Sequence, residues 1–357
     1  MKSNFDFLNR YWPALAQIGA TAETYVYSDP NACIYKLGMF AERLVQEILV
    51  FEHIAEPAVD NTHANRIRIL KRAGLLPHEI DNTLYVLRKT RNTAVHTGTD
   101  SVDEAKTLLS LTYNLAVWFM ETYGDWGYIA PEFVMPSETT HEDLESVIAE
   151  QERKIEELTK QLAVVKTAAS GKTQKERAKR SESVSAMMNW NEAQTRCLID
   201  EQLRLSGWEA DTQNLRYSKG TRPVKGRNIA ISEWPTNSAF YKNGYADYAF
   251  FVGEKLVALM DAKKMSEDVA STIDVQVKDY AAHIKPEDIP HTVGNWNGYQ
   301  VPFLFASNGR AYLEQLRTKS GIWFLDVREQ ENQPYPIRNW FSPSDLMEKL
   351  GQNTAAA

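Results

Sequence analysis

Residues 245–264 read YADYAFFVGEKLVALMDAKK, and this stretch decides the fold of the second half of the chain. Its apolar positions predict two adjacent strands, Tyr245–Val252 and about Leu256–Ala262. Gly253-Glu254 lies between them and favours a tight turn, because glycine adopts positive φ angles without steric penalty. We therefore expect a β-hairpin.

Three charged side chains lie on this expected hairpin. Asp247 is on the first strand, Asp261 is near the end of the second, and Lys263 follows two positions later. Residues two apart on a strand point to the same face, so Asp261 and Lys263 project together, and the hairpin brings Asp247 back toward them. Two carboxylates and an ammonium group suit divalent-metal binding and attack on a phosphodiester.

The composition is that of a globular chain with more than one core. Its 357 residues, 43% of them hydrophobic, predict two or three domains. The sequence shows neither a long apolar run nor a secretion signal, so we expect no membrane contact and a cytoplasmic location. Cys33 and Cys197 form no disulfide framework or zinc motif. The net charge of −7 leaves any contact with DNA to local basic patches and bridging metal ions.

Residues 1–125 are predicted to form a helical domain. Apolar residues recur at helical spacing in Ala32–Phe51 and Asp103–Tyr123, and Asn61–Ala73 and Leu84–Val95 continue the pattern. Arg91–His96 within this region resembles the Arg-x4-His motif of HEPN domains, some of which are metal-independent RNases. The competing interpretation, which we favour, is that Arg91 and Asn92 fix a helix end while His96 caps or packs.

Residues 126–190 are predicted to be a connector with a long helix. This helix has a heptad seam, which is formed by Leu144, Ile148, Gln151, Ile155, Leu158, Leu162 and Val165. The helix either docks a partner or lies against its own protein. Gly171-Lys172-Thr173 lacks the first glycine of a nucleotide-binding loop, and the basic run Lys172–Arg180 is expected to be a solvated linker that could touch phosphate.

Residues 191–335 are predicted to form an α/β domain with a mixed central sheet. A helix, Asn191–Leu205, carries the acidic candidates Asp200 and Glu201. Strands are expected at Glu209–Tyr217, Asn228–Ile231, Val301–Ala306 and Gly321–Val327, with a helix at Ser266–Ile284. A basic loop follows the first strand and contains Arg216, Lys219 and Arg222, which could follow a DNA backbone. Residues 336–357 are expected to be a terminal helix, Ser342–Leu350, and a tail.

The spacing of the charged residues resembles that of the PD-(D/E)xK nuclease superfamily. Asp247 and Asp261 are 14 residues apart, Asp261-Ala262-Lys263 matches the second motif, and Gln276 and Tyr280 match the Gln-x3-Tyr signature of the RecB-like branch. Ala246 stands where the first motif has proline.

The layout as a whole resembles the amino-terminal region of the type I restriction endonuclease R subunit. The resemblance covers essentially the whole chain and is carried by these segments: Lys2–Leu8, Arg91–His96, Leu198–Leu203, Arg216–Gly220, Ala230–Pro235, Tyr245–Tyr248, Asn308–Arg310 and Lys319–Trp323. In that family a DNA-translocating ATPase follows the nuclease. This chain contains no Walker A or Asp-Glu-x-His motif, so ATP use and translocation are expected outside these residues.

The resemblance implies a set of roles. Asp247, Asp261 and the carbonyl of Ala262 would hold Mg²⁺, Lys263 would orient the attacking water, and Glu201 would reach the metal through water. Gln276 and Tyr280 would contact phosphate or hold the lysine. The implied function is an endonuclease acting on double-stranded DNA without sequence specificity of its own, alongside methyltransferase and specificity subunits. Two alternatives remain: an assembly module that is inactive alone, and an RNase that uses Arg91 and His96.

Overall fold

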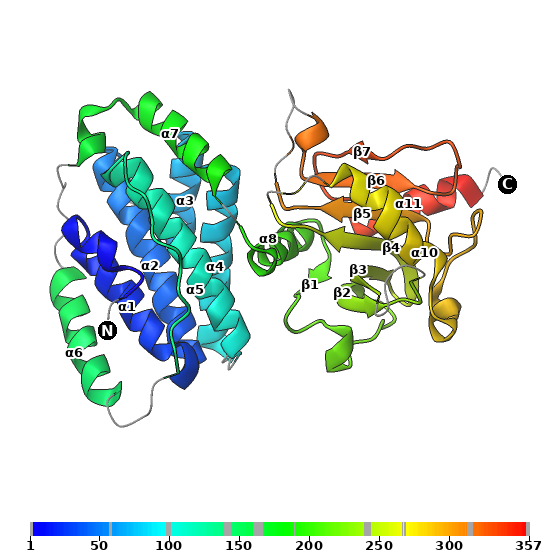
Figure 1. The fold of residues 1–357 in the computed structure, drawn as a ribbon, viewed down its shortest axis with the longest axis horizontal. Helices are drawn as coiled ribbons and strands as arrows, with labels where there is room; N and C mark the ends of the chain where they lie inside the picture. Colours follow the sequence, from blue (N-terminus) through cyan, green and yellow to red (C-terminus); the bar gives the residue numbers. More distant parts are fainter. Residues whose placement is uncertain are drawn as a thin grey trace. The chain divides into compact units, whose positions relative to one another are not determined.

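The computed structural model describes residues 3–56, 59–97, 101–138, 144–159, 167–188, 190–238, 244–265, 267, 269–310, 312 and 317–354 (Figure 1). The chain divides into two compact units, Met1–Met188 and Asn189–Ala357. The first is entirely helical in its described part, and the second is built on a mixed sheet. The predicted combination of a helical domain and an α/β domain with a mixed sheet, an α+β fold class for the whole chain, is thereby confirmed. No described helix combines the length and apolar character that a membrane crossing needs.

The first unit is a bundle of helices that pack along their apolar stripes. They are α1 (Pro13–Ser28), α2 (Pro30–Phe51), α3 (His63–Arg72), α4 (His78–Thr97) and α5 (Val102–Phe119), and α5 runs into a π turn at Met120–Gly124. The sequence starts these helices with recognisable caps. The Asp29 carboxylate accepts a 2.8 Å bond from the Ala32 amide, and the Ser101 hydroxyl accepts a 3.2 Å bond from the Glu104 amide.

The helix with the heptad seam, α6 (Leu144–Thr159), lies against α1 of its own unit. The Glu152 carboxylate accepts a 3.2 Å bond from the Tyr25 hydroxyl and lies 3.1 Å from the Lys36 ammonium group. Ile155, a seam residue, is 5% exposed. Of the two interpretations of the seam, the described part of the helix therefore supports the one in which it lies on its own protein. Leu162 and Val165 lie outside the described residues.

The basic run Lys172–Arg180, expected to be a solvated linker, instead forms part of a packed helix, α7 (Gln174–Met187). Its Arg177 is buried and forms a two-pronged ion pair with Glu52, while the Arg180 guanidinium lies 3.1 Å from Glu121. The Thr173 hydroxyl caps the helix by accepting a 3.2 Å bond from the Glu176 amide. The expectation of a linker was wrong because carboxylates distant in sequence neutralise these arginines.

The second unit is organised around seven strands in sequential order. They are β1 (Glu209–Ala210), β2 (Asn228–Pro235), β3 (Tyr245–Val252), β4 (Lys255–Ala262), β5 (Phe303–Ser307), β6 (Ile322–Asp326) and β7 (Tyr335–Pro336). The β1–β2 and β4–β5 pairs are parallel and the others are antiparallel. Gly253 has a φ of +61°, so the predicted β3–β4 hairpin and its glycine turn are confirmed.

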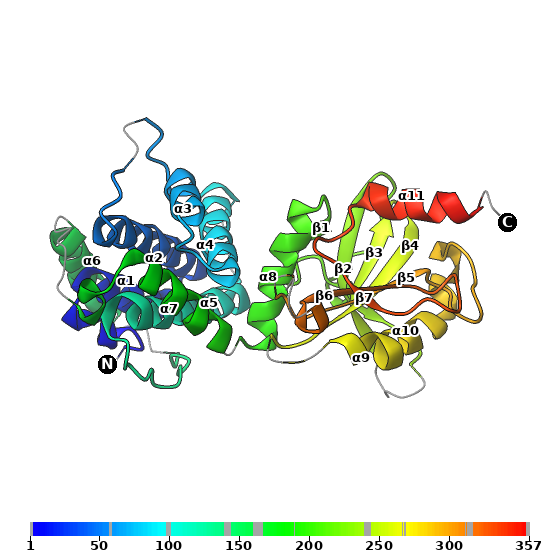
Figure 2. The same ribbon diagram turned by 90° about the horizontal axis from the view of Figure 1, so that it is seen from above.

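Helices cover both faces of this sheet (Figure 2). α8 (Glu192–Leu205) and α11 (Pro343–Thr354) cover one face, where Ile199, Phe250 and Leu346 are buried together. The opposite face is covered by one continuous segment: α9 (Ala270–Thr272), a π turn (Ile273–Val277) and α10 (Lys278–Ala282). The expected Ser266–Ile284 helix is therefore interrupted by a π turn, and residues 266 and 268 lie outside the described residues.

Two strand predictions differ markedly from the structure in length, and the others differ by no more than two residues at either end. The expected Glu209–Tyr217 strand is only β1, because the Asp211 carboxylate accepts 3.0 Å and 2.9 Å bonds from the Gln213 and Asn214 amides and folds the chain into a turn. The expected Asn228–Ile231 strand extends to Pro235 through its antiparallel pairing with β3. The short β7 was not anticipated at all.

Candidate active site

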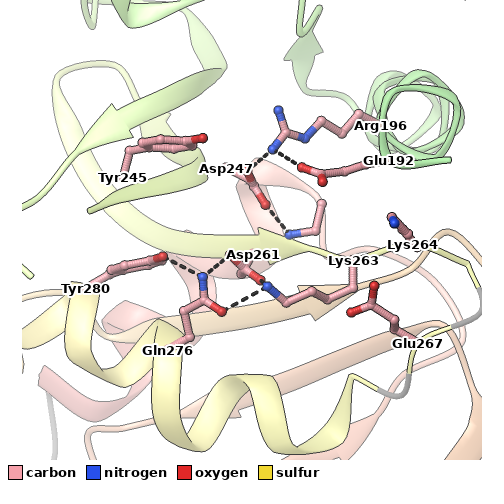
Figure 3. A pocket seen from close by; sticks show the side chains of 11 residues that line it. Glu192, Arg196, Tyr245, Asp247, Asp261, Lys263, Lys264, Glu267, Gln276 and Tyr280 are labelled. Atoms are coloured by element: carbon pink, nitrogen blue, oxygen red, sulfur yellow. Dashed lines mark hydrogen bonds and ion pairs between the residues drawn. The ribbon is translucent and has the colours of Figure 1, made fainter. Parts of the chain in front are cut away.

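A pocket of about 320 Å³ lies where the end of the hairpin, the start of α8 and the π turn meet (Figure 3). All of its lining residues belong to the second unit. They are Glu192, Arg196, Tyr245, Asp247, Asp261, Ala262, Lys263, Lys264, Glu267, Gln276 and Tyr280.

The strand register places the two aspartates side by side. Tyr248 pairs with Met260, and Asp247 directly precedes the former while Asp261 directly follows the latter. Asp247 is 5% exposed and Asp261 is 3% exposed. One oxygen of Asp247, Oδ2, accepts a 2.6 Å bond from the Ala262 amide. The main chain of β4 therefore holds the first carboxylate beside the second.

Arg196 from α8 occupies the other side of Asp247 (Figure 3). Its Nη2 group pairs with Asp247 Oδ1 and, at 2.6 Å, with the Glu192 carboxylate one helical turn earlier. Its Nη1 group is 3.7 Å from Glu233. One guanidinium thus neutralises charge from two residues of the pocket and approaches a third carboxylate beyond them.

A second chain of contacts fixes Lys263 beside Asp261. The Lys263 ammonium lies 2.6 Å from Asp261 Oδ2 and donates a 2.9 Å hydrogen bond to the side-chain oxygen Oε1 of Gln276. The side-chain nitrogen Nε2 of Gln276 in turn donates a 2.9 Å hydrogen bond to Asp261 Oδ1 and a 2.6 Å hydrogen bond to the Tyr280 hydroxyl. Gln276 lies on the π turn, a helix irregularity that is common at functional sites.

Burial and crowding of like charges shape the protonation of the pocket. Burial, reinforced by Asp261, raises the pKa of Asp247 to about 7, although Arg196 opposes the shift. Burial also raises the pKa of Asp261 against the opposing effect of Lys263. For Lys263, burial alone would lower the pKa, but the attraction of Asp261 outweighs it and raises it. The paired carboxylates retain protons more strongly than free aspartates do, as expected of a site that favours added positive charge.

Six of the residues singled out in the sequence meet in this pocket: Asp247, Asp261, Ala262, Lys263, Gln276 and Tyr280. Glu201 does not line it, because its carboxylate turns to Arg204, whose Nε donates a 3.0 Å bond. Asp200 does not line it either. Its two oxygens accept bonds of 2.8 Å and 2.9 Å from Thr212 and fix the turn after β1.

The basic loop residues also lie outside the pocket lining. Arg216 is 3.4 Å from Glu233, the same carboxylate that Arg196 approaches. Lys219 is exposed, and the exposed Arg222 stacks 3.7 Å from the centroid of the Tyr217 ring. The structure therefore connects Arg216 to the pocket through charged neighbours and leaves Lys219 and Arg222 on the surface.

Sequence reasoning missed five residues of the lining: Glu192, Arg196, Tyr245, Lys264 and Glu267. Glu192 and Arg196 are four apart on the expected helix, as Gln276 and Tyr280 are, so the same spacing argument could have paired them. Lys264 directly follows the motif lysine, and Tyr245 begins the first strand two positions before Asp247.

Arg91, the other basic candidate, has a structural partner in the first unit. Its Nη1 group lies 2.6 Å from Glu42, and its guanidinium lies 5.0 Å from the centroid of the Tyr35 ring. The side chain of His96 lies outside the described residues. These contacts give Arg91 a structural role, but Arg91 lies within α4 and pairs with Glu42 of α2, so it does not fix the helix end as the structural interpretation expected.

Comparison with known proteins shows what the pocket-bearing unit is similar to. The family described as the second domain of the type I restriction enzyme EcoKI endonuclease subunit matches residues 209–350. The type I restriction enzyme EcoKI endonuclease subunit of Escherichia coli (strain K12) is 29% identical over an alignment that covers 98% of this chain. The chain is thus similar to a type I restriction endonuclease subunit along nearly its whole length.

This similarity confirms the resemblance inferred from the sequence. The chain spans 36% of the length of the Escherichia coli subunit, and no solved structure matches it significantly. The matched family segment contains Asp247, Asp261 and Lys263 but begins after α8. Arg196 and Glu192 therefore belong to the pocket without belonging to the segment that the family description covers.

Proposed function

We propose that the second unit is a Mg²⁺-dependent endonuclease module that hydrolyses DNA phosphodiester bonds without sequence specificity of its own. The observation that carries this proposal is the pairing of two buried aspartates with a lysine fixed beside them in a pocket. A relative that is described as an endonuclease subunit supports the same reaction class.

The residues present fit a hard divalent cation. Asp247, near the start of β3, and Asp261, near the end of β4, supply carboxylate oxygens at the open end of the hairpin, and the Ala262 carbonyl follows on β4. The described residues contain no cluster of three or more acidic, histidine or cysteine side chains arranged to hold a metal. Mg²⁺ suits such a sparse protein donor set, since it keeps several water ligands and binds through one or two carboxylates together with substrate phosphate.

The bound cation would lower the pKa of a water molecule and neutralise charge on the reacting phosphate. The chain's own contribution is positioning. Gln276 and Asp261 fix the Lys263 ammonium beside the carboxylates, where it would orient the attacking water or stabilise developing negative charge. Tyr280, bonded to Gln276 and 3% exposed, holds the amide in the orientation that both partners require.

The substrate we propose is double-stranded DNA, held through its phosphates. Lys264 is exposed at the pocket, and Arg216, Lys219 and Arg222 remain our candidates for contacts further along the backbone. Phosphate contacts carry no sequence information, so sequence choice would come from specificity and methyltransferase subunits. ATP would be used by a motor domain of the longer subunit and not by these residues.

A nicking assay on supercoiled plasmid tests this function. The chain with Mg²⁺ should convert plasmid to open circles, and EDTA should abolish the reaction. Asp261→Asn and Lys263→Met should each lower the rate by at least about a hundredfold, because each removes a group that acts on the reacting phosphate. Asp200→Asn is the matched control, since Asp200 is a buried aspartate outside the pocket. Nicking that survives both pocket substitutions would remove the assignment.

A further inference from the structure

Three of the four oxygens of the paired aspartates accept hydrogen bonds from the protein, and the fourth, Asp261 Oδ2, faces the Lys263 ammonium group but accepts no hydrogen bond among the described residues. Asp247 Oδ2 accepts from the Ala262 amide and Oδ1 from Arg196, while Asp261 Oδ1 accepts from Gln276 and Oδ2 faces Lys263. Three of these partners belong to the hairpin or to the Lys263–Gln276 contacts that organise it. Arg196 alone among these four reaches the pair from α8, 51 residues earlier in the chain.

Arg196 is also incompletely bonded where it lies. A guanidinium has five N–H donors. Its Nη2 serves both Asp247 and Glu192, its Nη1 is 3.7 Å from Glu233, and its buried Nε has no hydrogen-bond partner among the described residues. This guanidinium therefore has donor capacity that its present contacts do not use, in the planar fork that matches a phosphate.

Glu233 offers Arg196 a second carboxylate position. Its φ of +55° lies in the left-handed region, which is uncommon for a residue other than glycine and occurs here inside β2. The Glu233 carboxylate lies near both Arg196 and Arg216, on the side of the basic loop. An arginine released from Asp247 would thus still have a negative neighbour.

We propose that Arg196 is a positioning residue that competes with the divalent cation for Asp247. In this arrangement a DNA phosphate draws the guanidinium away as it arrives, so that cation and DNA bind cooperatively. The proposal rests on the endonuclease function proposed above. Its physical basis is that a guanidinium on Asp247 Oδ1 repels a divalent cation placed on the same carboxylate, and that a phosphate removes this repulsion.

The first arm of the test measures cation affinity without DNA. Mn²⁺ is titrated into the full chain at pH 8.0 and constant ionic strength, and free Mn²⁺ is followed by electron paramagnetic resonance. Arg196→Met should bind Mn²⁺ about tenfold more tightly than the unmodified chain, because it removes the competing charge. Arg196→Lys, which keeps the charge on a shorter side chain without the fork, should fall between the two.

Two matched variants separate the possible results. Arg204→Met removes an arginine from the same helix that pairs with Glu201 outside the pocket, and its Mn²⁺ affinity should equal that of the unmodified chain. Asp261→Asn should lose Mn²⁺ binding. If the unmodified chain and Asp261→Asn bind Mn²⁺ equally, the endonuclease proposal itself fails. If binding requires Asp261 but Arg196→Met is no tighter than the unmodified chain, only the competition is overturned.

The second arm measures the cooperativity. The affinity for a fluorescent 20-base-pair duplex is measured by anisotropy with EDTA and with Ca²⁺. Ca²⁺ should tighten DNA binding by the unmodified chain several times more than it tightens binding by Arg196→Met, because only the former has a cation–arginine conflict for the phosphate to relieve. An equal effect of Ca²⁺ on both proteins would overturn the coupling. Circular dichroism melting curves establish that each variant is folded.

Discussion

Each unit of this protein contains an arginine paired with a buried carboxylate, and the two pairs differ in how completely they are bonded. Arg177 in the first unit places Nε 2.8 Å from Glu52 Oε1 and Nη2 on Oε2, and its Nη1 donates to the carbonyls of Ala169 and Lys172. Arg196 in the second unit shares one nitrogen between Glu192 and Asp247 and leaves Nε without a hydrogen-bond partner among the described residues.

The difference separates a structural contact from a functional one. Arg177 uses all three guanidinium nitrogens, two of them on the two oxygens of Glu52 and the third on main-chain carbonyls, and it joins α7 to the end of α2. The Arg196–Asp247 pair lines a pocket, and its carboxylate stands next to a second one. A fully bonded buried pair has little to offer a ligand, whereas an incompletely bonded pair beside a cavity can exchange partners.

The largest expected effect on stability comes from breaking the Arg177–Glu52 pair. Arg177→Met keeps the apolar stem but leaves Glu52, whose side chain is fully buried, without its charge partner. Removal of one member of a buried ion pair destabilises a protein by about 3–5 kcal/mol. Hydrogen–deuterium exchange should therefore show loss of protection in α2 and α7 and unchanged protection in β3 and β4.

Arg196→Met breaks the corresponding pair in the second unit. Its carboxylate partner lines a pocket that water can enter, and burial already raises the pKa of Asp247 to about 7, so this carboxylate can take up a proton in place of the arginine. The loss of protection in the second unit should consequently be much smaller than the loss that Arg177→Met causes in the first. Comparable losses from the two substitutions would contradict the distinction.

The pairs also show what the sequence could and could not predict. The hairpin was predictable because strand alternation, Gly253 and the short spacing from Asp261 to Lys263 are local features. The Gln276–Tyr280 contact followed from helical spacing of four. These local rules place residues relative to one another within an element or across a tight turn, and there they were sufficient.

Contacts between distant elements were not predictable in the same way. The sequence of Lys172–Arg180 resembles a solvated linker, because Glu52, which neutralises Arg177, lies 125 residues away. The α8 helix was predicted, but helical periodicity does not determine which end of a helix approaches a hairpin. Glu201 was therefore chosen for the site where the structure places Glu192 and Arg196, near the start of the helix.

A pH experiment tests whether the carboxylate of the Arg196–Asp247 pair takes up a proton. The pKa of Asp247 is raised from 3.8 to about 7, so the folded protein binds this proton more strongly than the unfolded chain does. The resulting stabilisation is fully present below about pH 4 and is lost as pH rises through about 7, with a slope of at most about 1.4 kcal/mol per pH unit. In EDTA, the unfolding free energy of the second unit should fall across this window.

The control for this pH effect is Asp247→Asn, which has no such proton to lose. The difference in urea unfolding free energy between the unmodified chain and Asp247→Asn isolates the contribution of Asp247 from that of other carboxylates. Mg²⁺ added at pH 8 should restore stability to the unmodified chain only, since a cation bound to the folded state stabilises it. Parallel pH curves for the two proteins would show that Asp247 is not perturbed by burial.

The smallest expected effect concerns Glu192, the carboxylate that shares Arg196 Nη2 with Asp247. Glu192 is half exposed and shares Nη2 with Asp247, so Glu192→Gln leaves the guanidinium more fully on Asp247 and should weaken Mn²⁺ binding about twofold to threefold. Glu201→Gln should leave Mn²⁺ affinity unchanged, because the Glu201 carboxylate pairs with Arg204 outside the pocket. Both variants are titrated with Mn²⁺ at a temperature well below their unfolding transitions. A large loss of affinity in Glu201→Gln, with none in Glu192→Gln, would instead favour the acidic residue chosen from the sequence and would require α8 to present its other end to the hairpin.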